Sequence, residues 1–170
     1  CYTEQNYKTC IMQKPFLKQN IENELKEAIK PKVDSCLNSF KDSSEKKGYS
    51  ISFKKPAVSV ELVPNSAIVS LDNIDLKIAK EKTESYKSLK NEMSSKLYNF
   101  VMIVSSISNW EARFGTSETI NYMINYPYLK VEKKKQSEGT TVYILTDKNS
   151  GEKFMFASRS LVLPSGISGK

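Results

Sequence analysis

With 170 residues, a hydrophobic fraction of 39% and an aromatic fraction of 10%, the chain can bury a core and does not have a disordered composition. Its formal net charge is +7, but only Arg113 and Arg159 among its 26 basic residues are arginine, the residue that recognises phosphates and bases by paired hydrogen bonds. Histidine is absent, and with it the usual general base and the commonest metal ligand. These totals favour a lysine-coated surface and disfavour an enzyme, a metalloprotein or a nucleic-acid binder.

The first predicted element is a long amphipathic helix that begins near Phe16. Pro15 suits its first turn, and Pro31 falls inside the pattern, where a proline removes a hydrogen bond and should cause a kink. We expect the helix to end in the polar residues 42–47, before Gly48. Glu22 and Lys26 have the spacing of a solvated ion pair. The apolar stripe consists of Leu17, Ile21, Leu25, Ala28, Ile29, Val33, Cys36, Leu37 and Phe40.

The three cysteines, Cys1, Cys10 and Cys36, lie in the first 36 residues and form no C-x-x-C motif, so we expect no metal site. In an oxidising compartment a disulfide is favoured. At about 1.5 Å per helical residue, Cys36 lies roughly 30 Å from the helix start. Cys10 reaches only about 20 Å. We therefore expect Cys1–Cys36 first and Cys1–Cys10 second, with Cys10–Cys36 only if the helix breaks at Pro31. One thiol remains in each case for an intermolecular bridge.

The period then changes from helical to alternating, which predicts an antiparallel meander covered on one face by the first helix. Apolar residues alternate in residues 49–53 and 58–62, and a longer strand follows the Pro64–Asn65 turn through residues 68–78. Its apolar face changes sides near Asn73, which indicates a bulge or a twist.

A second long helix is predicted over residues 84–114, with Trp110 in its core-facing stripe, and Gly115 as its end. Its longest apolar run, residues 100–104, is far shorter than the roughly 20 residues of a transmembrane helix. Thr116 and Thr119 are candidate caps for a short helix through Ile124.

Strands are predicted at residues 129–133, 140–146 and 153–158. Asp147, Asn149 and Gly151 resemble the start of a calcium loop but lack its third oxygen ligand and final Glu, so they indicate a hairpin turn. The fold class is therefore α+β: a long amphipathic helix, an antiparallel meander, a second long helix and a C-terminal hairpin or small meander. We expect one domain over residues 1–163, with lobes 1–82 and 83–163 as an alternative, and a tail at 164–170.

No phosphate loop, nucleophile motif or supported pair of acids is present, so we expect no catalytic residue and no cofactor. The cluster Tyr122, Tyr126 and Tyr128, with Pro127 among them, is the candidate interface. Such tyrosines stack on sugars or bases or anchor a protein partner, and they also serve simply to roof a core.

Several segments resemble a family of uncharacterised archaeal cell-surface proteins from small-genome lineages, which carry an N-terminal membrane anchor, some with pilin-like leaders. The resemblance implies an ectodomain outside the cell, where Cys36 would be oxidised, and it supplies no catalytic residues. The anchor is not seen in this sequence. The segments are IENEL at 21–25, CLNSF at 36–40, GYSI at 48–51, VSV at 58–60, AIVSL at 67–71, VYILTD at 142–147 and FMFA at 154–157.

The sequence thus predicts a non-catalytic binding or structural module outside the cytoplasm, for example a subunit of a surface appendage, with a protein partner or self-assembly and no nucleic acid. The alternative is an anchored, lipoprotein-like protein that binds a ligand or polymer, with Cys1 as its lipidated N-terminus. Membrane attachment would depend on an anchor outside this sequence.

Overall fold

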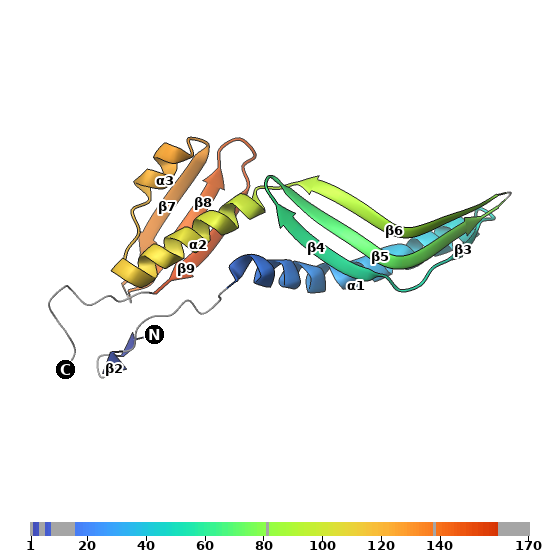
Figure 1. Cartoon of the computed structure of the whole chain (residues 1–170), viewed down its shortest axis with the longest axis horizontal. Helices are drawn as coiled ribbons and strands as arrows, with labels where there is room; N and C mark the ends of the chain where they lie inside the picture. The colour runs from blue at the N-terminus through green and yellow to red at the C-terminus, as the bar shows by residue number, and fades with distance from the viewer. Residues whose placement is uncertain (1, 4–5, 8–15, 81, 138, 160–170) are drawn as a thin grey trace. The chain divides into compact units, whose positions relative to one another are not determined.

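The computed structural model describes residues 2–3, 6–7, 16–80, 82–137 and 139–159, and its fold class is α+β, as predicted (Figure 1). The chain forms two compact units: the meander unit, residues 18–95, and the pocket unit, residues 1–17 and 96–170. Two short paired strands, β1 (Tyr2–Thr3) and β2 (Asn6–Tyr7), lie in the first residues of the chain. The expected domain of residues 1–163 stays a prediction, and its tail lies outside the described residues.

Helix α1 (Leu17–Glu45) extends through Pro31 as one continuous helix. It is followed by Gly48 with a φ of 82°, the left-handed conformation expected of a helix stop. Leu37 is buried on its packed face, whereas its neighbour Cys36 is exposed. The spacing of Cys36 predicts that it belongs to the apolar stripe of the helix. The structure leaves it exposed, because successive helical residues point about 100° apart and Leu37 takes the packed face.

The meander is built around one long central strand, β5 (Ser66–Ala79). On one side it pairs with β4 (Ala57–Val63) through its first half and β3 (Ser50–Ser52) through its second half. On the other side it pairs with β6 (Thr83–Ser94). All pairings are antiparallel. The β5–β6 register shifts between Asp72 and Leu76, where Asn73 and Asp75 have positive φ, so the irregularity predicted near Asn73, a bulge or a twist, is confirmed.

The core of the meander unit lies between α1 and this sheet and contains Leu37, Ile51, Ile74 and Leu76. The carboxylate of Glu22 ties the helix to edge strand β4: it accepts the backbone N–H of Leu62 at 2.7 Å. Lys18 Nζ donates to the same oxygen at 2.7 Å. The predicted Glu22–Lys26 pair is therefore wrong, because the carboxylate turns toward the strand and toward the preceding helical turn.

The predicted helix over residues 84–114 is wrong in its first part, because β6 is a strand and α2 (Leu97–Phe114) begins at Leu97. Tyr86, Leu89 and Met93 have helical spacing, but pairing with β5 along most of β6 outweighs that pattern. Leu89 is the one residue of β6 that is partly buried, and the others are exposed. A strand with so little burial has no alternation for the sequence to reveal.

The pocket unit is a three-stranded antiparallel sheet with two helices on one face. Its strands lie in the order β7 (Leu129–Lys135), β8 (Thr141–Asp147), β9 (Lys153–Ser158), which confirms the predicted small meander. Helix α2 contacts β9, and the short helix α3 (Ile120–Asn125) contacts β7 (Figure 1). The core consists of Phe100, Ile103, Val104, Ile107, Leu129, Val131, Tyr143 and Leu145.

The β8–β9 connection is the predicted hairpin turn. The Asp147 carboxylate accepts backbone N–H groups of Asn149 at 2.9 Å and Ser150 at 2.8 Å. Burial works to raise the pKa of Asp147, but these hydrogen bonds outweigh it and hold the pKa below its usual value. The turn therefore uses the carboxylate as a local hydrogen-bond acceptor.

Replacing Glu22 by Ala should expose the importance of its bond to Leu62. The variant leaves a backbone N–H of a buried residue without its acceptor, so we expect the meander unit to lose about 1–3 kcal/mol of unfolding free energy. Glu27→Ala, at an exposed position of the same helix, is the control and should change stability by less than about 0.5 kcal/mol. Hydrogen exchange of the Leu62 amide measures the effect directly; equal protection in both variants would contradict it.

Candidate functional site

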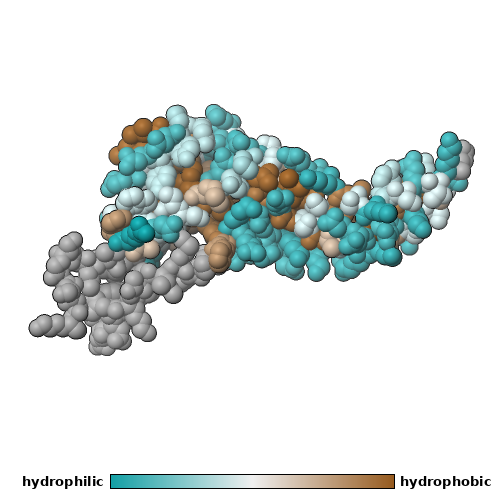
Figure 2. Space-filling model, in the orientation of Figure 1, coloured by the Kyte–Doolittle hydropathy of each residue, from teal (hydrophilic) through white to brown (hydrophobic). Residues whose placement is uncertain are grey.

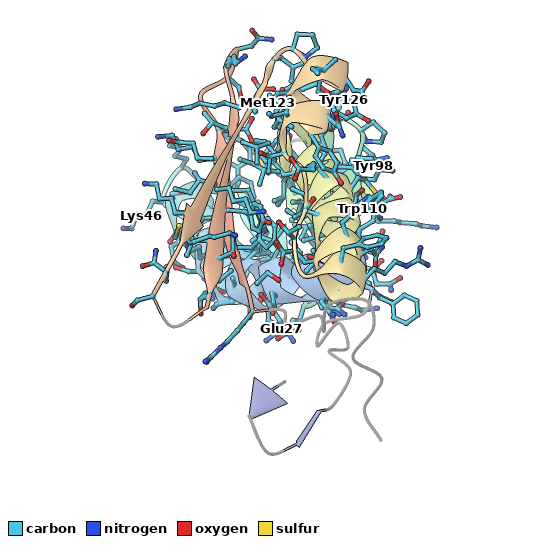
Figure 3. The ribbon with its side chains drawn as sticks, turned by 90° about the vertical axis from the view of Figure 1, so that its left-hand side faces the viewer. Glu27, Lys46, Tyr98, Trp110, Met123 and Tyr126 are labelled. Atoms are coloured by element: carbon cyan, nitrogen blue, oxygen red, sulfur yellow. The ribbon has the colours of Figure 1, made fainter. Side chains whose placement is uncertain are left out.

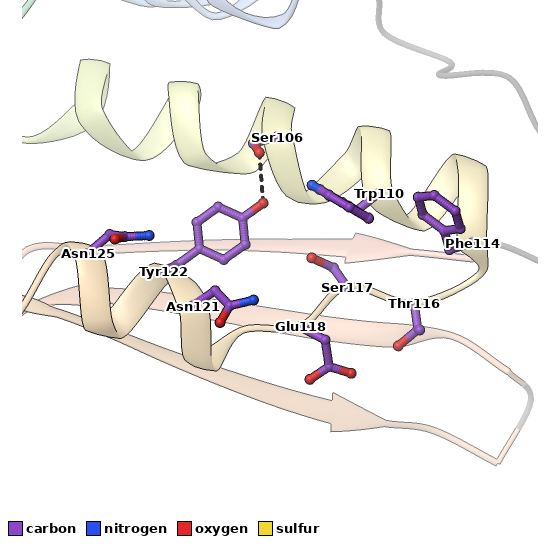
Figure 4. A pocket seen from close by; sticks show the side chains of 9 residues that line it. All are labelled: Ser106, Trp110, Phe114, Thr116, Ser117, Glu118, Asn121, Tyr122 and Asn125. Carbon is purple, nitrogen blue, oxygen red and sulfur yellow. Dashed lines mark hydrogen bonds between the residues drawn. The ribbon is translucent and has the colours of Figure 1, made fainter.

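A cavity of about 410 Å³ opens in the pocket unit between α2, the loop after it and α3 (Figure 4). This volume lies within the range of about 300–1,000 Å³ that small-molecule sites occupy. The cavity is named here the α2–α3 pocket. Its lining residues are Ser106, Trp110, Phe114, Thr116, Ser117, Glu118, Asn121, Tyr122 and Asn125.

Trp110 and Phe114 form an aromatic wall on one side of the pocket. They are one helical turn apart on α2, with ring centroids 4.8 Å apart and planes inclined by 30°. Trp110 is 52% exposed and Phe114 is 55% exposed. Trp110 lies on the side of α2 away from the sheet (Figure 3). The prediction that Trp110 belongs to the core is wrong, because Ile103, Ile107 and Glu111 occupy the buried face instead.

The opposite side of the pocket is α3, which contributes polar side chains. The Tyr122 hydroxyl is 2.7 Å from Ser106 Oγ, and this bond links α3 to α2 (Figure 4). Asn121 and Asn125, one turn apart, are exposed and line the pocket. Glu118 is also exposed, and its carboxylate points away from the aromatic wall (Figure 4).

Ser117 is the polar residue of the pocket that is most deeply buried. Its hydroxyl has no hydrogen-bond partner among the residues that the structure describes. Figure 4 shows this hydroxyl turned toward the space between Tyr122 and Trp110. Leaving a buried hydroxyl without a partner costs about 1–3 kcal/mol. The protein therefore holds, at this pocket, a polar group that a bound molecule could satisfy.

Beneath the pocket lies a buried polar cluster that fixes its loop. Glu111 on α2 is 1% exposed, and its carboxylate accepts a short hydrogen bond from the Tyr143 hydroxyl on β8. Lys133 Nζ on β7 lies 4.0 Å from the same carboxylate oxygen. The Lys133 ammonium also donates to Thr116 Oγ1 at 2.6 Å and to the Ser117 carbonyl at 3.0 Å. Lys133 thus joins the buried carboxylate to the loop that carries Ser117.

The same cluster perturbs the tyrosine. Burial of the phenol raises the pKa of Tyr143 far above its usual value, and the hydrogen bond to Glu111 and the charge of that carboxylate raise it further. Tyr143 is thereby held as a neutral hydrogen-bond donor. Its ring stacks on Phe156 with centroids 5.0 Å apart, and Lys133 Nζ lies 5.6 Å from the centroid of the Tyr143 ring.

The three tyrosines of the predicted interface are near one another but differ in role. Tyr122 and Tyr128 pack partly buried against the core. Tyr126 is exposed and meets Tyr128 edge-on, with centroids 6.0 Å apart. Tyr122 alone of the three lines the pocket.

The cysteine predictions fall mostly outside the described residues. Cys36 has an exposed, free thiol on α1. Cys1 and Cys10, its candidate partners, lie outside the described residues, so the disulfide stays a prediction.

Sequence reasoning missed the aromatic wall, Ser117 and the cluster of Glu111, Lys133 and Tyr143. One signal was available: Glu111 follows Val104 and Ile107 at helical spacing, so a carboxylate occupies a core position of α2. Ser117 carried no such signal, because Gly, Thr and Ser in succession, as at residues 115–117, are typical of any loop.

The surface of α3 that faces outward carries a small apolar patch. Ile120 and Ile124 are 61% and 69% exposed, and hydrophobic atoms gather over α3 in Figure 2. Within the described residues, no group of three or more His, Cys, Asp or Glu could hold a metal ion, and no helix is long and apolar enough to cross a membrane.

Comparison with known proteins adds no further constraint. No protein-family model, no curated protein and no solved structure matches the chain. Functional inference therefore depends on the residues themselves.

Lys133→Met should destabilise the pocket unit strongly. The change leaves the Glu111 carboxylate buried without its cation, and breaking a buried pair in this way costs about 3–5 kcal/mol. Lys134→Met, at an exposed position of the same strand, is the matched control and should cost less than about 0.5 kcal/mol. The sequence has one tryptophan, so urea unfolding followed by Trp110 emission measures this unit. Similar midpoints for the two variants would refute the role given to the cluster.

Stability should also fall at high pH because of Tyr143. A phenol whose pKa is raised on folding stabilises the folded state below its unfolded pKa of about 10, and this contribution is lost as pH rises through the folded pKa. Tyr143→Phe should therefore be less stable than wild type at neutral pH, and the gap should narrow above about pH 10. Urea midpoints from pH 7 upward measure it, with the exposed Tyr126→Phe as control. A gap that stays constant would contradict the prediction.

Proposed function

We propose that this chain is a non-catalytic binding module that faces the outside of the cell and binds its ligand in the α2–α3 pocket. One observation carries the proposal: a half-exposed aromatic wall and a buried hydroxyl without a partner line the same cavity. Small-molecule sites combine apolar and aromatic walls with a few polar groups that fix orientation. Exposed tryptophan is also a residue type that dominates binding energy at interfaces.

The ionisable groups around the pocket support binding over catalysis. Glu111, the buried carboxylate, is engaged by Tyr143 and Lys133 beneath the floor. Lys133 in turn donates to the loop. Glu118 points away from the aromatic wall (Figure 4). The sequence supplies no histidine that could act beside them. These groups hold the pocket in shape, and none of them stands as a poised acid or base.

The proposed location rests on other features. Several segments of the sequence resemble archaeal cell-surface proteins, and that resemblance supports an extracytoplasmic module. The same resemblance supports action with a protein partner or within a surface assembly, attached through an anchor outside this sequence.

Binding at the pocket can be tested with Trp110 as an intrinsic probe. We expect at least one class from a set of neutral oligosaccharides, short peptides and quaternary ammonium compounds to change Trp110 emission in a saturable way. Phe114→Ala removes half of the aromatic wall and should weaken that binding about tenfold or more, equivalent to about 1.4 kcal/mol. Met102→Ala, at an exposed position of the same helix, is the control and should bind as wild type. A pocket that responds to no class would overturn the proposal.

The location has a separate test based on Cys36. Intact cells of the source organism are treated with a membrane-impermeant maleimide, with and without an impermeant reductant, and modification of Cys36 is mapped by mass spectrometry. We expect Cys36 to be labelled without lysis. A reduced thiol is labelled directly, and an oxidised thiol is labelled after treatment with the reductant. Labelling that requires lysis in both conditions would place the protein inside the cell.

A further inference from the structure

We infer that the ligand of the α2–α3 pocket is a neutral saccharide, bound with one ring against the Trp110–Phe114 wall and its hydroxyls on Ser117, Asn121 and Asn125. This inference rests on the proposed function and names the chemical class that the same pocket takes.

The charges at the pocket argue against an anion. Glu118 is the charged side chain in the lining, and it is acidic. Lys133 beneath the loop is 20% exposed, and its ammonium is held by Thr116, the Ser117 carbonyl and the Glu111 carboxylate. No lining residue is basic, so a phosphate or carboxylate ligand would find no cation in the pocket wall and would be repelled by Glu118.

The charges also argue against a cation held by the rings. An ammonium over Trp110 or Phe114 gains most when it is desolvated and when a carboxylate completes its site. Here both rings are about half exposed, and the carboxylate of Glu118 points away from them (Figure 4). A neutral ligand needs neither a desolvated ring nor a carboxylate beside that ring.

The aromatic wall fits a ring with an apolar face. A sugar ring presents axial C–H groups on its face and hydroxyls at its rim. The face of an aromatic ring is electron-rich and attracts C–H hydrogens, which carry partial positive charge. Trp110 and Phe114, with centroids 4.8 Å apart and planes inclined by 30°, stack on each other, so the sugar ring would lie on the face of one of them and not across both.

The opposite side fits hydroxyls. A sugar hydroxyl both donates and accepts a hydrogen bond, and the side-chain amides of Asn121 and Asn125 offer one NH₂ donor group and one acceptor each. Both amides lie on the pocket side of α3, and in the part of the chain that the structure describes neither has a hydrogen-bond partner (Figure 4). The unpartnered Ser117 hydroxyl lies between these amides and the aromatic wall (Figure 4). The pocket therefore offers neutral, two-way hydrogen bonding opposite an apolar platform.

Ser117 should show opposite effects on stability and on binding. Removing a buried hydroxyl that has no partner relieves a penalty, so Ser117→Ala should melt at the same or a higher temperature than wild type. Its affinity for saccharide should nevertheless fall, by roughly three- to tenfold, since the ligand loses one hydrogen bond. Ser105→Ala makes the same chemical change within α2, where the hydroxyl donates to the Val101 carbonyl. That control should bind saccharide as wild type.

The deciding experiment titrates the whole chain with maltotriose and with a β-linked trimer of N-acetylglucosamine, and Trp110 emission is the readout. We expect saturable binding of at least one trimer, weakened in Ser117→Ala and Asn121→Ala and unchanged in Ser105→Ala. No response up to roughly 10 mM, which corresponds to a binding free energy weaker than about 3 kcal/mol, overturns the saccharide assignment.

The outcomes also separate the two proposals. If neither trimer binds but a peptide or a quaternary ammonium compound binds in a manner sensitive to Phe114→Ala, the assignment of saccharide is wrong and the pocket remains a binding site. If no probe of any class binds, both proposals fail. Saccharide binding that is equally strong in Ser117→Ala, Asn121→Ala and Phe114→Ala would place the sugar elsewhere and overturn the inference.

Discussion

The geometry of the pocket unit depends on one carboxylate buried under its main helix. Glu111 occupies a position that an aliphatic residue would fill without electrostatic cost, and a buried charge is tolerated only with partners. Tyr143 on the central strand and Lys133 on the edge strand supply them. Since Lys133 also holds Thr116 and the Ser117 carbonyl, the ion cluster sets the path of the loop. An apolar core could make this unit equally stable, but it would leave that loop without an anchor.

The cluster also explains why Ser117 can stay unpaired. A loop free to relax would turn a buried hydroxyl toward water or a carbonyl. Here Lys133 holds both the carbonyl of Ser117 and the hydroxyl of the preceding Thr116. With the loop restrained at these two points, the Ser117 side chain has little freedom to seek a partner of its own. Preorganised polar groups of this kind lose little entropy when a ligand arrives.

Most of the secondary structure could be predicted because its patterns are local. The stripe of α1, the alternation in β4 and the turn at Asp147 follow from spacing and turn chemistry alone. The failure at β6 has a specific cause. Its residues are almost all exposed, so no periodic burial marks it as a strand, and only its pairing with β5 makes it one. The pocket could not be predicted for a similar reason. Trp110 has the spacing of a core residue but lies beside the buried face of α2, and Ser117 becomes a candidate binding residue only through its neighbours on β7 and β8.

Strand β6 has one more consequence, for the behaviour of many copies of the chain together. Among the described strands it pairs only with β5, so 12 residues of sheet edge remain open. Open edges are templates for another chain. Glu84, Lys87, Lys90 and Glu92 place charges of both signs along this strand. A second strand added there would have to bring matching charges in register, so these side chains make the meander resist indiscriminate edge-to-edge aggregation.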